Sequence, residues 1–306
     1  MSQIAPPHTD DEIPAYLEAL GLPGVIDLHV HFMPERVQQK VWGFFDRLPE
    51  MGAPAWPIAY RYSDDERVQI LRKLNVRAFS TLNYAHRPGM AKILNDYSRD
   101  FAATYEDAIH SATFYPEPGV EEQVEQVLAD GAQLFKVHVQ VGAFSPLDPQ
   151  LDASWRLIAQ ARTPVVIHCG SGPHGGEHTG PEPIVELVER YPDLVLVIAH
   201  MGMPEYDEFG DLARQAPNVY LDTTMVGTDF IAQNFGSLRE KYLETVAELQ
   251  DKIVLGTDFP TIPYSYSHQL EVLHNWGLGE DWMRSVLWHN PQRLLANVQA
   301  SPIPTQ

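Results

Sequence analysis

The chain has 306 residues, of which 44% are apolar, so it can bury a large core and suits one α/β barrel or two ordinary domains. Its formal net charge of −20 argues against a nucleic-acid partner, which clustered Lys and Arg would bind, and no basic amphipathic or long apolar segment indicates a membrane partner. The single cysteine, Cys169, excludes an internal disulfide framework, and the first residues contain no secretory signal. A cytoplasmic location is therefore the default expectation.

The first 23 residues are polar and contain several prolines, which predicts an N-terminal arm with one short helix over 13–20. Residues 33–62 follow a predicted strand and are rich in aromatic residues and proline without a clean period. This pattern indicates a long insertion that covers a site or packs on a neighbour. If they are not part of a lid, four of its aromatic residues would be contacts in a homo-oligomer: Trp42, Phe44, Phe45 and Trp56.

A regular alternation of helical and strand patterns begins at residue 64. Predicted helices cover 64–74, 90–107, 120–130, 150–162, 183–191, 204–215 and 230–249, and a mostly helical stretch covers 266–298. Predicted strands cover 24–31, 76–82, 109–115, 132–139, 164–168, 194–200, 219–222 and 253–257. Several of these strands are apolar on both faces, which is typical of parallel strands buried between two layers.

Eight such units predict a single (β/α)8 TIM barrel over 24–298, with a long insertion after strand one, a helical C-terminal stretch and a tail over 299–306. The alternative is an open, doubly wound sheet. That fold would need a phosphate-binding loop after an early strand, and neither G-x-G-x-x-G nor G-x-x-x-x-G-K follows any of them.

Nearly all the ionisable residues within the apolar strands lie at strand ends, where the chemistry of a TIM barrel takes place. A single residue of this kind is most simply a polar side chain that has a hydrogen-bond partner within the protein. Because burying an unpaired charge is costly, the convergence of several on one rim indicates a bound ligand. They are His29 and His31 on strand one, Lys136 and His138 on strand four, His168 on strand five, His200 on strand six, Asp222 on strand seven and Asp258 on strand eight.

His29 and His31 are two residues apart in an extended segment, so we expect their imidazoles to face the same way and share one metal ion. The same alternation predicts that Leu28, Val30 and Phe32 point the other way. A buried, hydrogen-bonded core histidine is an equally good explanation of this pair alone. Histidine nitrogens with one carboxylate form a common ligand set for catalytic Zn²⁺, which lowers the pKa of bound water to about 7.

Four segments match, in order and spacing, the amidohydrolase superfamily, and specifically resemble its amidohydrolase 2 branch of metal-dependent hydrolases similar to aminocarboxymuconate-semialdehyde decarboxylase. The resemblance covers about residues 24–296, including the helical ending 287–294. The segments are Asp27-Leu28-His29-Val30-His31, Val166-Ile167-His168-Cys169-Gly170, Val197-Ile198-Ala199-His200-Met201-Gly202 and Leu255-Gly256-Thr257-Asp258-Phe259-Pro260.

This resemblance implies that one divalent metal ion, expected to be Zn²⁺, is held by His29, His31, His168 and Asp258. It also implies that Asp258 accepts a proton from metal-bound water. His200 would act beside the metal as an acid or base, or as a hydrogen-bond donor to the substrate.

Lys136 has two interpretations. In the first, it binds an anionic group of the substrate or lies next to the metal ligands. In the second, it is carbamylated and bridges two metals, as the equivalent lysine does in binuclear members of the superfamily. His138 is a candidate substrate contact or a structural histidine, and Arg61 either binds a substrate carboxylate or is a surface arginine. Cys169 follows a predicted ligand and is interpreted as a buried structural thiol.

These observations favour a metal-dependent hydrolase that acts on a small polar amide, lactone or ester. Non-oxidative decarboxylation of an aromatic or unsaturated carboxylic acid is the alternative, because the same scaffold supports both reactions. An inactive barrel kept as a binding module is a third hypothesis, and the intact set of four candidate ligands weakens it.

Overall fold

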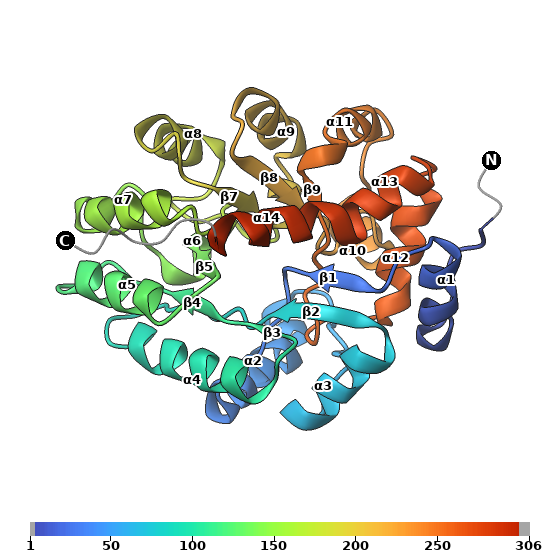
Figure 1. The fold of residues 1–306 in the computed structure, drawn as a ribbon, viewed down its shortest axis with the longest axis horizontal. Helices are drawn as coiled ribbons and strands as arrows, with labels where there is room; N and C mark the ends of the chain where they lie inside the picture. The colour runs from blue at the N-terminus through green and yellow to red at the C-terminus, as the bar shows by residue number, and fades with distance from the viewer. Residues whose placement is uncertain (1–3, 300–306) are drawn as a thin grey trace.

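The structure, a computed structural model, describes residues 4–299 and is built on two parallel sheets surrounded by helices (Figure 1). The first sheet has the order β1 (Val25–Asp27), β2 (Val76–Ser80) and β3 (Ala108–Ile109). The second sheet follows chain order through β4 (Ser111–Thr113), β5 (Leu134–His138), β6 (Val165–His168), β7 (Leu196–Ile198), β8 (Val219–Asp222) and β9 (Ile253–Val254).

Two seams connect these sheets. At one seam, β3 and β4 are consecutive parts of one strand interrupted at His110. At the other, the Leu28 N–H donates to the Leu255 carbonyl over 3.0 Å, and Val30 forms a parallel bridge with Phe259. These bonds join the first strand to the last, and the predicted parallel (β/α)8 barrel is confirmed.

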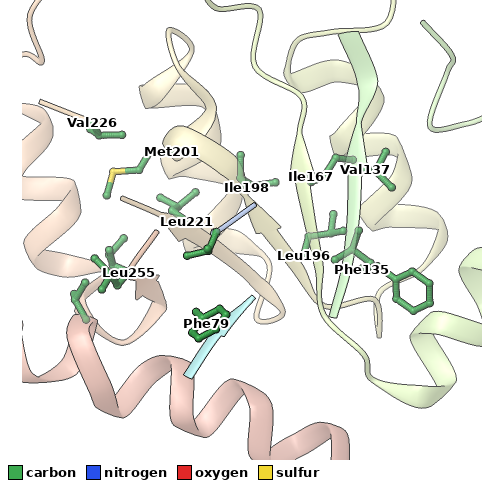
Figure 2. Packing of buried hydrophobic residues seen from close by; sticks show 14 of the residues in the cluster. Phe79, Phe135, Val137, Ile167, Leu196, Ile198, Met201, Leu221, Val226 and Leu255 are labelled. Carbon is green, nitrogen blue, oxygen red and sulfur yellow. The ribbon is translucent and has the colours of Figure 1, made fainter. Parts of the chain in front are cut away.

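Side chains that alternate along the strands form two apolar layers. One layer lies between strands and helices and includes Phe135, Val137, Ile167, Leu196 and Ile198 (Figure 2). The other fills the barrel interior and consists of Ile26, Leu28, Leu82, Ile109, Leu134, Val166, Val195, Val197, Ala199, Val254 and Leu294.

Leu294 in this inner layer belongs to the C-terminal helix α14 (Asn290–Gln299), which crosses the barrel in Figure 1. The helix therefore closes the end of the barrel that contains the strand N-termini, and the strand-end polar residues lie at the opposite end. The preceding residues form α12 (Tyr266–Asn275), α13 (Glu280–Arg284) and a π-helical turn over Ser285–His289, as the helical pattern predicted.

The surrounding helices follow the predicted order with one exception. The predicted helix over 230–249 is wrong as a single element, because it is divided into α10 (Asp229–Phe235) and α11 (Tyr242–Glu248) by Gly236, which has φ +108°. No helix among residues 4–299 is long and apolar enough to cross a membrane. The other helices of the ring are α3 (Asp64–Lys73), α4 (Ala91–Thr104), α5 (Val120–Ala129), α7 (Asp152–Ala161), α8 (Pro181–Arg190) and α9 (Tyr206–Gln215).

The N-terminal arm and the insertion after strand one both pack on the barrel. In the arm, α1 (Ile13–Ala19) buries Ile13 and Leu17 completely. The insertion contains a helix that the sequence pattern did not reveal, α2 (Glu35–Asp46). Trp56 then donates its indole N–H to the Thr261 carbonyl over 2.6 Å and packs against Phe230. The insertion therefore lies over α10, which follows β8, and over the loop that follows β9. The predicted tail lies, apart from residue 299, outside the described residues.

Candidate active site

Three of the predicted metal ligands lie together where the first and last strands meet. One ligand atom each of His29, His31 and Asp258 lies within 4.8 Å of the others. Nε2 of His31 is 2.9 Å from Oδ1 of Asp258, and Nε2 of His29 is 3.8 Å from the same oxygen. Both histidines are buried, whereas the Asp258 side chain is 19% exposed, so the cluster is reached from solvent at that carboxylate.

The two histidines reach this cluster through a break in the strand pattern. The sequence predicted that Leu28, Val30 and Phe32 all point away from the histidines. Val30 and Phe32 do pack in the layer under the helices, but Leu28 packs inside the barrel with Ile26. This part of the prediction is wrong because regular strand geometry ends at Asp27, so the two-residue alternation does not continue through residue 28.

Each imidazole is oriented by a bond at its other nitrogen. Nδ1–H of His29 donates to Oδ2 of Asp222 over 2.8 Å, and Nδ1–H of His31 donates to the Leu82 carbonyl over 3.0 Å. Both oxygens can only accept, so in each neutral imidazole the lone pair is at Nε2. Burial, reinforced by the Lys136 charge, lowers the pKa of His29 to about 3 and keeps the ring neutral. Metal-binding histidines typically have such partners.

This arrangement fits a divalent metal ion. Neutral His31 presents a lone pair at Nε2 and Asp258 presents a carboxylate oxygen, so two acceptors face each other across 2.9 Å. A cation bound to both removes that repulsion, and two imidazole nitrogens with one carboxylate oxygen suit Zn²⁺ and similar ions. Burial raises the pKa of Asp258, but the contact with His31 and the nearby His29 and His200 outweigh that effect and hold the pKa well below its usual range, so the carboxylate is charged.

Lys136 is in direct contact with this cluster. The residue is 1% exposed, its Nζ is 3.0 Å from Nε2 of His29, and burial lowers its pKa to about 8. Lys136 and a metal ion would therefore use the same lone pair of His29. A metal bound there would require Lys136 to find another acceptor, and a substrate anion is one.

His168 is not part of the ligand cluster. Its Nε2–H donates to the Gly172 carbonyl over 3.2 Å, and its ring stacks on His138 at 3.9 Å. Its role as the fourth ligand stays a prediction: the lone pair of neutral His168 is at Nδ1, and His168 does not lie with the three clustered ligands. Cys169 beside it is a buried free thiol whose pKa is raised by burial, as befits a structural residue.

His200 and Asp258, the two predicted catalytic residues, both have left-handed backbone conformations. Their φ angles are +55° and +72°, a region that costs energy for residues other than glycine and that is typical of functional sites. The backbone N–H of His200 donates to Oδ1 of Asp222, and its Nδ1–H donates to the Thr224 carbonyl over 3.1 Å. The lone pair of neutral His200 is therefore at Nε2.

Arg61 is the one predicted site residue whose contacts lie elsewhere. Its guanidinium pairs with the exposed carboxylate of Asp46 and lies over the ring of Trp42. These contacts agree with the interpretation of Arg61 as a surface arginine. None of them supports a role for Arg61 in binding a substrate carboxylate.

Six aromatic side chains, which include His29 and His31 of the cluster, form a closed circle of neighbouring rings, and one of them, Tyr84, was missed by the sequence analysis. Tyr84 follows β2 in a loop, and only its position shortly after a strand end could have indicated it. In sequence around the circle, the ring centroids are separated by 5.1 Å for His29 and His31, 6.1 Å for His31 and Tyr84, 5.0 Å for Tyr84 and His138, 3.9 Å for His138 and His168, 4.8 Å for His168 and His200, and 5.3 Å for His200 and His29.

Solved structures with the same fold share little sequence with this chain. An uncharacterized TIM-barrel protein from Bordetella bronchiseptica is 20% identical with a TM-score of 0.71, and covers 90% of this chain and 99% of its own. A probable 2-pyrone-4,6-dicarboxylic acid hydrolase from Acinetobacter baumannii, solved with citric acid, is 15% identical with a TM-score of 0.60 and coverages of 89% and 99%. A 5-carboxyvanillate decarboxylase from Novosphingobium aromaticivorans, solved with manganese, is 14% identical with a TM-score of 0.58 and coverages of 90% and 98%.

A search of curated proteins found no match. The family model described as amidohydrolase, by contrast, matches residues 26–296, which include every strand-end residue described above. The chain therefore belongs to the amidohydrolase family.

Proposed function

We propose that this protein is a metal-dependent hydrolase that acts on a small polar ester, lactone or amide. The observation that carries the proposal is the cluster of His29, His31 and Asp258, in which three buried or half-buried acceptors converge and the imidazoles are fixed by Asp222 and Leu82. We further propose Zn²⁺ as the metal and His168 as an additional ligand through Nδ1, with its Nε2–H held by the Gly172 carbonyl.

A divalent ion held there would acidify a water molecule and stabilise negative charge on a carbonyl oxygen. Asp258 has one oxygen toward His31, and its other oxygen has no partner within residues 4–299, so it can accept the proton of the attacking water. The water oxygen bonds to the carbonyl carbon, the bond from carbon to the leaving group breaks, and Asp258 returns the proton to that group. His200 can relay this proton at Nε2.

The neutral form of His200 cannot donate a hydrogen bond to the carbonyl oxygen, because its only N–H is used by Thr224. The resemblance allowed His200 either role, and we favour the acid or base over the donor. The donor for the substrate oxygen would then be another side chain.

The proposal is tested with a panel of lactones, esters and amides, on protein loaded with Zn²⁺ or Mn²⁺. We expect hydrolysis of at least one class, loss of metal in His29→Ala, and loss of turnover in Asp258→Asn. Matched controls are His174→Ala and Asp251→Asn, which change exposed residues. Equal activity in Asp258→Asn and Asp251→Asn would contradict the proposal.

Decarboxylation of an aromatic or unsaturated acid is the second candidate, and Lys136 is the observation that favours it. A buried amine in contact with His29 suits a substrate whose carboxylate lies beside the metal ligands. Release of CO2 from aromatic acids, without hydrolysis of any lactone, would replace the first proposal with this one.

A further inference from the structure

The six rings of the circle differ in whether they have an N–H or O–H group that is free to donate a hydrogen bond to a substrate. His29, His31 and His200 donate from Nδ1 to Asp222, Leu82 and Thr224, so each presents a lone pair at Nε2. His168 donates its Nε2–H to Gly172 and has a lone pair at Nδ1. Four of the six rings therefore have no free donor for a substrate oxygen.

His138 differs from these four histidines. Its Nδ1 accepts a hydrogen bond from the backbone N–H of Val141 over 3.3 Å. A nitrogen that accepts from an N–H has no proton of its own, so His138 is neutral and its proton is at Nε2. Among residues 4–299, nothing accepts a hydrogen bond from this Nε2–H.

Tyr84 supplies the second free donor. Its ring packs at 5.0 Å from that of His138 and meets His31 edge-on at 6.1 Å, so it lies between the predicted substrate contact and a predicted metal ligand. A phenol keeps its proton at neutral pH, so the Tyr84 hydroxyl is a hydrogen-bond donor. Within the part of the chain that the structure describes, its hydroxyl has no hydrogen-bond partner.

We infer that the Tyr84 hydroxyl and the His138 Nε2–H together bind an anionic oxygen of the substrate, either a carboxylate or the carbonyl oxygen that gains charge during hydrolysis. This inference rests on the proposed function and deepens it, because it makes Tyr84 a catalytic residue and indicates a substrate with a carboxylate or carbonyl oxygen at this position. Donors fixed in advance toward developing charge contribute strongly to catalysis. The rings of Tyr84 and His138 are neighbours at 5.0 Å, and neither donor is used within residues 4–299.

The test measures binding of acetate by calorimetry to wild-type protein and to Tyr84→Phe, with and without added Zn²⁺. Because a hydrogen bond to a charged group is lost, we expect the variant to bind acetate roughly 10-fold to 100-fold more weakly. Its Zn²⁺ content and melting temperature should equal those of the wild type. The matched control is Tyr191→Phe, which removes a hydroxyl bonded to Asp152.

A second variant, His138→Phe, should weaken acetate binding by a similar factor. Acetate affinity unchanged in Tyr84→Phe, or no binding of acetate by the wild type, overturns the inference and leaves the proposed function standing if the protein takes up metal. Absence of metal uptake instead overturns the proposed function. In that case, acetate binding by metal-free wild-type and Tyr84→Phe protein still decides whether Tyr84 binds the anion.

Discussion

Asp222→Asn isolates the effect of His29 orientation on metal binding, because the change keeps the size of the side chain. Oδ1 of Asp222 accepts from the backbone N–H groups of His200 and Thr224 at 2.8 and 3.0 Å, and an asparagine oxygen can keep both bonds. The new amide group takes the place of Oδ2, which now accepts from Nδ1 of His29 at 2.8 Å.

An amide N–H cannot accept a hydrogen bond, so two donors would face each other unless His29 moves its proton to Nε2. In that tautomer the lone pair points to the asparagine and the N–H points toward Asp258 and Lys136. Loss of such an orienting partner typically weakens metal binding about 10-fold to 100-fold, which corresponds to about 1.4 to 2.8 kcal/mol.

The assay is a competition titration of Zn²⁺ against a chromophoric chelator, with thermal melting to confirm that the variant is folded. The control is Asp152→Asn, which affects a carboxylate bonded to Tyr191 near the surface and should leave metal affinity unchanged. A folded Asp222→Asn protein with wild-type affinity would refute the reasoning, because the tautomer of His29 would then have no role in metal binding.

Three further predictions concern other parts of the molecule. His200→Ala should lower kcat by about 10²-fold to 10⁴-fold with metal content unchanged, because it removes a proton relay and not a ligand; an equal loss of metal would contradict this. Leu294→Ala should lower the free energy of unfolding, measured in urea, by about 2 to 5 kcal/mol, because Leu294 is 2% exposed and fills the barrel end; Leu295→Ala, at a half-buried position, should cost less. Asp10→Ala should cost about 1 to 3 kcal/mol and speed amide exchange at Ser267, whose N–H Asp10 accepts over 2.9 Å; unchanged exchange would show that the arm does not stabilise α12.

The barrel could be predicted from the sequence because its signals are local and repeated. Apolar runs such as Val165-Val166-Ile167 have few alternatives to a buried parallel strand, and each is followed by a helical period. The helix α2 was missed although Val37, Val41 and Phe44 follow a helical spacing, because the flanking prolines and aromatic residues drew the interpretation toward an irregular insertion. The break at Gly236 depends on a single residue within an otherwise helical pattern.

The candidate site was predicted in residue identity but not in geometry. Strand-end position identified His29, His31 and Asp258, because buried charge at a barrel rim demands a partner. The bond that holds His168 to Gly172 and the direction of each imidazole proton depend on contacts between distant segments, so no sequence pattern reveals them. Tyr84 escaped notice for the same reason, since a tyrosine in a loop has no distinctive spacing.

The most direct test of the central claim is the metal content of the chain, measured by elemental analysis on protein prepared without chelator and with bicarbonate present. Our account predicts about one Zn²⁺ or similar divalent ion per chain, bound at His29, His31 and Asp258 and lost in His29→Ala. Two ions per chain would instead support carbamylated Lys136 as a bridge. No metal, and no uptake when Zn²⁺ or Mn²⁺ is added, would contradict the account and leave the strand-end histidines with a structural role only.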